Sequence, residues 1–123
     1  MYKYIDTEYG QVVLITNKKD IILWEDSQHE EILSDNIILL LDIDISSNKI
    51  KHYIKKYSTD NVIFFAEKWN LIKCFKALNI GGSGLIKKEQ IISVPNTLQL
   101  VSQGQCVIDS EVTNLLGKLI KNF

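Results

Sequence analysis

Asn36-Ile-Ile-Leu-Leu-Leu-Asp42-Ile-Asp44 is the stretch that decides the fold of this 123-residue chain. Residues 37–41 are all apolar and lead to a carboxylate at Asp42, and such an unbroken run predicts a strand buried on both faces. A strand of that kind needs helices on each side of its sheet. In open α/β sheets the functional crevice lies beyond the carboxyl ends of the strands, so Asp42 is a candidate functional residue. It could equally cap the helix that follows.

The segments on either side of this strand alternate between strand and helix patterns. Runs rich in β-branched and aromatic residues predict strands at 11–16, 21–25 and 62–66. Apolar residues at helical spacing predict amphipathic helices at 50–57 and 69–78. An alternation of strands and helices is typical of a parallel sheet.

Capping and turn residues predict smaller elements. Ser27-Gln-His-Glu30 matches a capping box, which predicts a short helix at 28–33 with a solvated His29. Pro95 suits the first turn of another helix. Residues 1–9 mix aromatic and acidic side chains without a clear period, so they form either an extension or a short edge strand.

Composition and charge exclude several classes of function. The net charge is −1 and all fourteen basic residues are lysine, so the arginine forks that favour base and phosphate recognition are absent. We therefore expect no direct nucleic-acid binding. Cys74 and Cys106 lack metal-ligand spacing and no secretory signal precedes them, which predicts reduced thiols in a cytoplasmic protein. The longest apolar run is far shorter than the roughly 20 residues of a membrane span, so no membrane association is expected.

Three motifs carry a resemblance to a known family. They are Leu40-Leu-Asp42, the stretch from Ala77 through Gly81-Gly-Ser-Gly84 to Lys88, and residues 104–116. Together they resemble the response-regulator receiver domains, specifically those at the front of LuxR/NarL-type transcription regulators.

This resemblance covers about 36–116 and assigns roles to several residues. It implies that Asp42 stands at the phosphoacceptor position. It also implies that Lys88 stands at the position of the lysine that contacts the phosphoryl group. Residues 104–116 would lead toward a DNA-binding domain outside this chain.

The resemblance breaks at residues that operate the phosphorylation switch. Phosphorylation of a receiver aspartate depends on Mg²⁺ held by that aspartate and by an acidic pair after the first strand. Thr16-Asn-Lys-Lys19 stands there instead, Ala66 replaces the expected hydroxyl residue, and Leu85 replaces the aromatic switch residue. One alternative stays open, because Ile22-Leu-Trp-Glu-Asp26 also looks like a first strand ending in an acidic pair. In that case the Mg²⁺ ligands would be Glu25, Asp26 and Asp42.

Too few residues separate the predicted first and central strands. Residues 17–36 leave no room for the usual helix, strand and helix, because one crossover alone needs roughly 10–12 residues or more. The simplest arrangement is a hairpin between 11–16 and 21–25, which makes one edge strand antiparallel. The predicted fold over 1–108 is a three-layer α/β domain, receiver-like and flavodoxin-like, with a mostly parallel sheet and a shortened N-terminal half. The missing first helix would leave apolar surface exposed, which favours association.

Residues 109–123 predict a final amphipathic helix that serves as a linker or a dimerisation element. A helix of this length is marginal in isolation, so its stripe must pack against its own sheet or against a second subunit. We favour a homodimer, because in the resembled family this region leads to DNA-binding domains that work in pairs on two half-sites. The apolar stripe comprises Val112, Leu115, Leu116, Leu119, Ile120 and Phe123.

The sequence therefore predicts a degenerate receiver (pseudo-receiver) and not an enzyme. We expect it to act in two-component signal transduction and transcription regulation through protein–protein contacts, without phosphorylation and without a cofactor. Two alternatives remain. One is a functional phosphoacceptor that uses Asp42 and Lys88 with Mg²⁺, and the other is a small flavodoxin-like nucleotide-binding protein or enzyme, since fold alone does not fix function.

Overall fold

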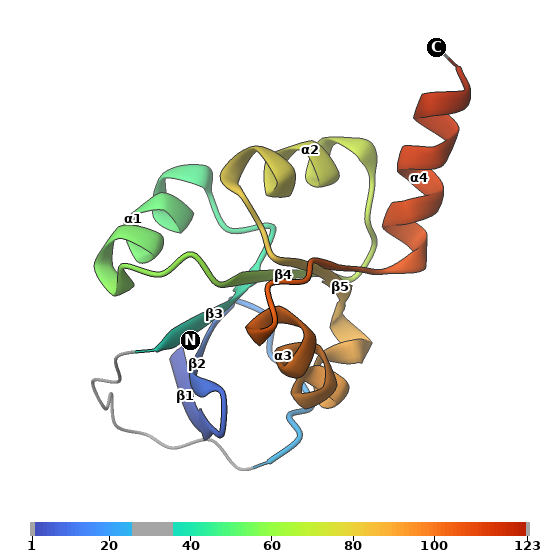
Figure 1. The fold of residues 1–123 in the computed structure, drawn as a ribbon. Helices are drawn as coiled ribbons and strands as arrows, with labels where there is room; N and C mark the ends of the chain where they lie inside the picture. Colours follow the sequence, from blue (N-terminus) through green and yellow to red (C-terminus); the bar gives the residue numbers. More distant parts are fainter. Residues whose placement is uncertain (1, 26–35, 123) are drawn as a thin grey trace.

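The sheet in the computed structural model, which describes residues 2–25 and 36–122, follows the chain order β1-β2-β3-β4-β5-β6 (Figure 1). β1 (Tyr2–Thr7) is antiparallel to β2 (Gly10–Ile15), and each later strand is parallel to its neighbour. The chain is thus an α/β protein with a mostly parallel sheet, as the sequence predicts. The later strands are β3 (Ile37–Asp42), β4 (Val62–Ala66), β5 (Gly84–Lys87) and β6 (Val107–Ile108).

Helices connect β3 to β4, β4 to β5 and β5 to β6, and side chains cap the start of several helices. The Ser46 hydroxyl accepts a hydrogen bond from the Lys49 amide, and the Asp109 carboxylate accepts one from the Glu111 amide. Each cap satisfies a backbone N–H that has no partner within the helix. The helices are α1 (Ser47–Tyr57), α2 (Leu71–Ile80), the 3-10 helix η1 (Lys88–Ser93), α3 (Val94–Ser102) with Pro95 in its first turn, and α4 (Ser110–Lys121).

Side chains from both faces of β3 are buried, as expected for an apolar run of this length. Its odd-numbered residues belong to a first hydrophobic cluster, to which Ile50 of α1, Ala77 of α2 and Val112 of α4 also belong. Its even-numbered apolar residues belong to a second cluster with Ile91 of η1 and Leu98 of α3. Packing on both faces fixes the carboxyl end of β3, at the edge of the sheet that the carboxyl ends of the parallel strands form.

The predicted hairpin between 11–16 and 21–25 is wrong, because β2 pairs with β1 instead. Residues 1–9 thus supply the antiparallel edge strand, and no strand forms at 21–25. Ile21, Leu23 and Trp24 pack against the second cluster and thus cover a sheet face instead of joining the edge, whereas Ile22 is exposed. The predicted helix at 28–33, with His29, lies outside the described residues.

A tight turn between Thr7 and Gly10 explains why the hairpin forms here. The Thr7 hydroxyl donates to the Gly10 carbonyl oxygen (2.6 Å) and accepts a hydrogen bond from the Tyr9 amide (3.2 Å). Gly10 has a φ of +134°, a conformation that residues with a side chain rarely adopt. A Cβ at this position would also overlap the Asn36 carbonyl oxygen.

Gly10→Ala should therefore lower the free energy of unfolding by about 1–3 kcal/mol. Urea unfolding followed by circular dichroism measures the change. Gly117→Ala is a matched control, because Gly117 lies in the interior of α4 and a Cβ at this position would meet no atom within 4 Å. That control should raise the stability by about 0.5–1 kcal/mol. A Gly10→Ala protein as stable as the parent would contradict the described turn.

Candidate functional site

Asp42 lies at the carboxyl ends of the parallel strands, where α/β sheets place their functional crevice. Ile15 pairs with Leu41, so Thr16 follows β2 directly beside Asp42. The Asp42 side chain is 3% exposed, and both of its carboxylate oxygens accept hydrogen bonds. Thr16 Oγ1 donates to Oδ2 (3.0 Å), and the Asp44 amide donates to Oδ1 (3.0 Å).

The ammonium group of Lys18 neutralises the buried charge of Asp42. Lys18 Nζ lies 2.9 Å from Asp42 Oδ1 and 3.1 Å from Asp44 Oδ2. It also lies 5.6 Å from the centroid of the Phe65 ring, and its side chain is only 18% exposed. The ammonium group therefore sits between two carboxylates, where a cation bound to Asp42 would otherwise lie.

These contacts shift the pKa values of Lys18 and Asp44. Burial favours the neutral form of Lys18, but the hydrogen bonds to Asp42 and Asp44 outweigh burial and raise the pKa of Lys18. Burial also favours the neutral form of Asp44, but hydrogen bonds from Lys18 and Lys73 lower the pKa of Asp44. Lys73 Nζ lies 3.2 Å from Asp44 Oδ1. Lys18 and Asp44 thus remain charged at neutral pH.

Lys88 lies at the same edge of the sheet but contacts other carboxylates. Its Nζ is 3.1 Å from Glu67 Oε1 and 3.3 Å from Asp20 Oδ2. The hydrogen bond to Glu67 makes the largest contribution to the raised pKa of Lys88. Within the described part of the chain, no hydrogen bond or ion pair joins Lys88 to Asp42.

The structure does not bring Glu25 and Asp42, two of the predicted metal ligands, together. Glu25 lines a cavity with Thr7 and Tyr9 beside the β1–β2 turn, at the end of the sheet opposite to Asp42. Asp26 lies outside the described residues. Among the residues that are described, no three His, Cys, Asp or Glu side chains form a group that could hold a metal ion. Mg²⁺ requires a near-octahedral shell of oxygens, and a carboxylate already paired with an ammonium group does not fit that requirement.

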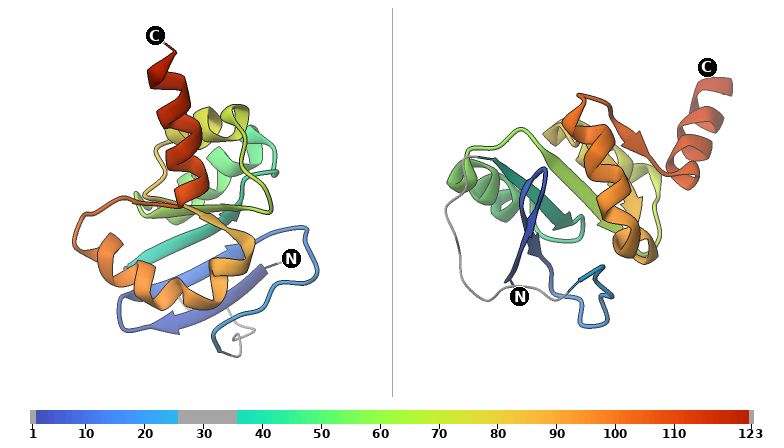
Figure 2. Two further views of the ribbon diagram at one scale, coloured as in Figure 1. Left: turned by 90° about the vertical axis from the view of Figure 1, so that its right-hand side faces the viewer. Right: turned by 60° about the horizontal axis from the view of Figure 1, so that its bottom comes forward.

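The apolar stripe of α4 is divided between the core and the solvent. Val112 is fully buried, and Leu115 and Leu116 pack against the first cluster. Ile120 is 71% exposed, and the C-terminal part of α4 projects away from the sheet (Figure 2). Phe123 lies outside the described residues. The first cluster thus buries the first half of the stripe, whereas Ile120 in the second half is exposed.

A polar contact fixes the start of α4. Glu111 Oε2 lies 2.9 Å from Lys87 Nζ, and Glu111 Oε1 accepts a hydrogen bond from the Trp69 amide (2.9 Å). The Trp69 indole donates to the Ile86 carbonyl oxygen (2.8 Å). Hydrogen bonds from Lys87 and Trp69 lower the pKa of Glu111. The loop that follows β4 and the last residue of β5 therefore contact α4 directly.

Sequence reasoning missed the roles of Lys18 and Glu111. For Lys18 a signal exists, because a buried aspartate needs a counter-ion and the neighbouring strand ends in Thr16-Asn-Lys18. From the sequence, residues 16–19 are interpreted only as the position where the acidic pair of the receiver family is missing, and Lys18 is given no role of its own. For Glu111 the sequence carries no comparable signal, since the contact joins residues 42 positions apart.

Comparisons with protein-family models, with curated proteins and with solved structures find no match. In residues 2–25 and 36–122, no helix is long and apolar enough to cross a membrane. The function must therefore be argued from the site itself.

Lys18→Met should lower the free energy of unfolding by about 3–5 kcal/mol, because it removes one partner of a buried ion pair and leaves the other without its counter-ion. Chemical denaturation at neutral pH measures this loss. Lys19→Met is the matched control, since Lys19 is exposed and forms no ion pair with the described residues. It should change the stability by less than about 0.5 kcal/mol.

The double variant Lys18→Met/Asp42→Asn should recover a large part of that loss, because charge and counter-ion are removed together. Single-variant effects that simply add in the double variant would show that the two side chains do not interact.

Proposed function

We propose that this chain is a degenerate receiver-like signalling domain that acts through protein–protein contacts without phosphorylation of Asp42. The proposal includes a three-layer α/β architecture with a shortened N-terminal half. It assigns the chain to two-component signal transduction and transcription regulation, with a DNA-binding domain outside this chain as the output.

The contact between Lys18 and Asp42 carries the proposal. Phosphoryl transfer needs a nucleophilic oxygen in line with the donor and a divalent cation that neutralises charge on the transferring group. In this chain Asp42 Oδ1 accepts from Lys18 and Asp42 Oδ2 accepts from Thr16. The carboxylate is thus paired and hydrogen-bonded before any phosphodonor arrives, and no cation site adjoins it among the described residues.

The strand order supports the receiver-like interpretation. In the flavodoxin-like order 2-1-3-4-5, the first strand lies between the second and the third. Here β2 lies between β1 and β3, so the antiparallel β1 takes the place of the second parallel strand. A short hairpin would then replace a strand and its crossover helix. Ile21, Leu23 and Trp24 would cover part of the apolar face that the helix leaves.

Incubation with acetyl phosphate and Mg²⁺ should leave the intact mass of the chain unchanged, because Asp42 is already engaged by Lys18 and Thr16. Mass spectrometry of the whole protein measures this, with a phosphorylatable receiver treated in parallel to show that the reagent is active. A mass gain of one phosphoryl group that disappears in Asp42→Asn would overturn the proposal in favour of a functional phosphoacceptor.

We also propose that the distal part of α4 forms a homodimer. Leu119, which is half-buried, and Ile120 continue the apolar stripe beyond Leu116, which packs against the first cluster. An isologous contact between two such helices would remove these side chains from water. Full burial of each would contribute roughly 1.5–3 kcal/mol.

Ile120→Asp should therefore give a folded monomer, because a charge would enter the two-fold contact while the intramolecular core stays intact. Sedimentation equilibrium measures the oligomeric state, and circular dichroism checks folding. Ile72→Asp is the matched control, since Ile72 is 81% exposed on α2 and should leave the dimer unchanged. An unmodified chain that sediments as a monomer at high micromolar concentration would contradict the proposed dimer.

A further inference from the structure

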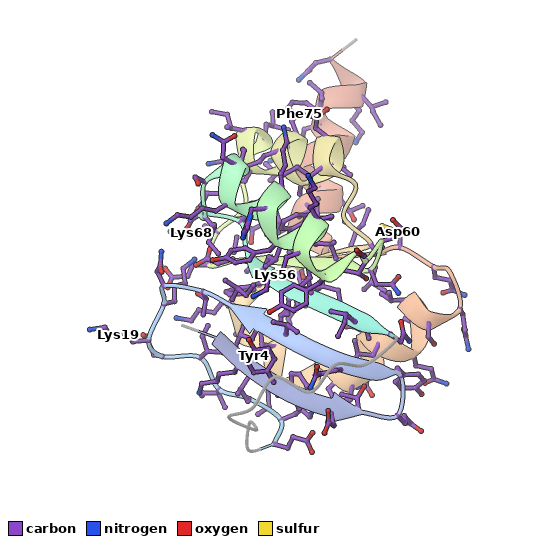
Figure 3. The ribbon with its side chains drawn as sticks, turned by 90° about the vertical axis from the view of Figure 1, so that its left-hand side faces the viewer. Tyr4, Lys19, Lys56, Asp60, Lys68 and Phe75 are labelled. Atoms are coloured by element: carbon purple, nitrogen blue, oxygen red, sulfur yellow. The ribbon has the colours of Figure 1, made fainter. Side chains whose placement is uncertain are left out.

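A groove open to solvent, with a volume of about 680 Å³, runs between α1 and α2. Ser47 and Lys51 of α1 line one side, and α2 contributes several apolar side chains on the other. Ile72 is 81% exposed and Phe75 is 49% exposed, and neither belongs to either hydrophobic cluster. Figure 3 looks onto this face and shows Phe75 on the outer side of α2. The α2 residues of the lining are Ile72, Phe75, Lys76, Leu78, Asn79 and Ile80.

The groove lies in the most basic part of the chain. Residues 46–80 contain seven lysines and two acidic residues, a net charge of +5, whereas the remainder has seven lysines and thirteen acidic residues, a net charge of −6. Lys49, Lys51 and Lys55 are exposed, and none of them forms an ion pair with the described residues. Figure 3 shows Lys56 and Lys68 on the same side of the molecule. Lys51 therefore lines the groove as an exposed lysine without an ion pair among the described residues, next to exposed apolar side chains of α2. The other lysine of the lining, Lys76, donates to the carbonyl oxygens of Ile43 and Ile45.

We infer that the groove between α1 and α2 binds an acidic segment of a partner protein that inserts apolar side chains between the lysines. This inference rests on the proposed function, because it names the kind of partner through which the chain signals. Large apolar side chains in a groove are the usual anchors of a protein contact, and complementary charge at the rim speeds association.

The positive charge around the groove favours an acidic segment over a second copy of the chain. An isologous contact through this face would place each lysine-rich surface against its own copy, and such like-charge juxtaposition disfavours association. The concave shape and the apolar floor favour inserted side chains over a flat membrane. The lack of arginine in the whole chain also makes a nucleic acid a poorer fit.

Selection from a random-peptide phage library against the immobilised full chain tests the inference. Enriched peptides should be net acidic and contain at least two large apolar residues. Fluorescence anisotropy of a labelled selected peptide should show at least about tenfold weaker binding to Phe75→Ser and to Lys51→Glu, the loss typical of a central contact residue. Binding should also weaken as the salt concentration rises, because exposed charges are screened.

Two matched controls lie outside the groove. Ile22→Ser removes another exposed apolar side chain and Lys118→Glu reverses another exposed lysine, and neither should change the affinity by more than about twofold. Circular dichroism confirms folding of all four variants.

Failure to enrich any peptide, enrichment of neutral or basic peptides, or equal binding by the groove variants and the controls would overturn the inference. Tighter, groove-dependent binding of anionic phosphatidylglycerol vesicles or of polyuridylic acid would also overturn it and would identify a membrane or a nucleic acid as the occupant. Phosphorylation of Asp42 by acetyl phosphate would instead contradict the proposed function without affecting the peptide result, so the two failures are distinguishable.

Discussion

The ion pair between Lys18 and the buried carboxylate of Asp42 is the contact on which the rest of the site depends. A buried carboxylate without a counter-ion is strongly unfavourable, so β3 can end in a buried aspartate only because its neighbours supply donors and a positive charge. Thr16 and the Asp44 amide provide the donors, and Lys18 provides the charge. The same ammonium group also pairs with Asp44, which joins the loop after β2 to the loop after β3. The edge of the sheet that commonly binds ligands is therefore closed by the chain's own side chains.

Closure of this edge also positions α2. Lys73 pairs with Asp44, and the Lys76 ammonium group donates to the carbonyl oxygens of Ile43 and Ile45. Burial lowers the pKa of Lys76, although neighbouring Asp44 partly offsets this effect. Two lysines of α2 thus hold the loop after β3, and the groove between α1 and α2 lies directly beside this loop. Under the proposed function, these internal contacts maintain the surfaces that bind other proteins.

Much of the fold is predictable because its determinants are local. The apolar run at 37–41 predicts a strand covered on both faces, and Pro95 predicts the first turn of α3. Local sequence does not determine which segment pairs with β2 in the hairpin. Residues 2–7 carry no clear period because Tyr4 contacts the first cluster while Ile5 lies in the second, so both faces hold large side chains. The apolar residues at 21–24 have the composition of a strand, yet three of them, Ile21, Leu23 and Trp24, cover a sheet face.

The candidate site is predictable only in part, for a related reason. Strand order brings Asp42 and Lys88 to one edge of the sheet, and the sequence motifs identify both positions. The sequence does not show which cation approaches Asp42, because a long flexible side chain can reach it from several loops. Only the parallel register of Ile15 with Leu41 places Lys18 within reach. A missing acidic pair and an added internal cation therefore look alike in the sequence, and both weaken metal binding at Asp42.

A titration of the ¹⁵N-labelled full chain with Mg²⁺, followed by two-dimensional NMR, tests the central claim most directly. If the Lys18 ammonium group takes the place of a metal ion at Asp42, the amide signals of Thr16, Lys18, Asp42 and Asp44 should not move, even with Mg²⁺ in large excess over the protein. Saturable shifts confined to these four amides would show that Mg²⁺ displaces the lysine, and they would contradict the account.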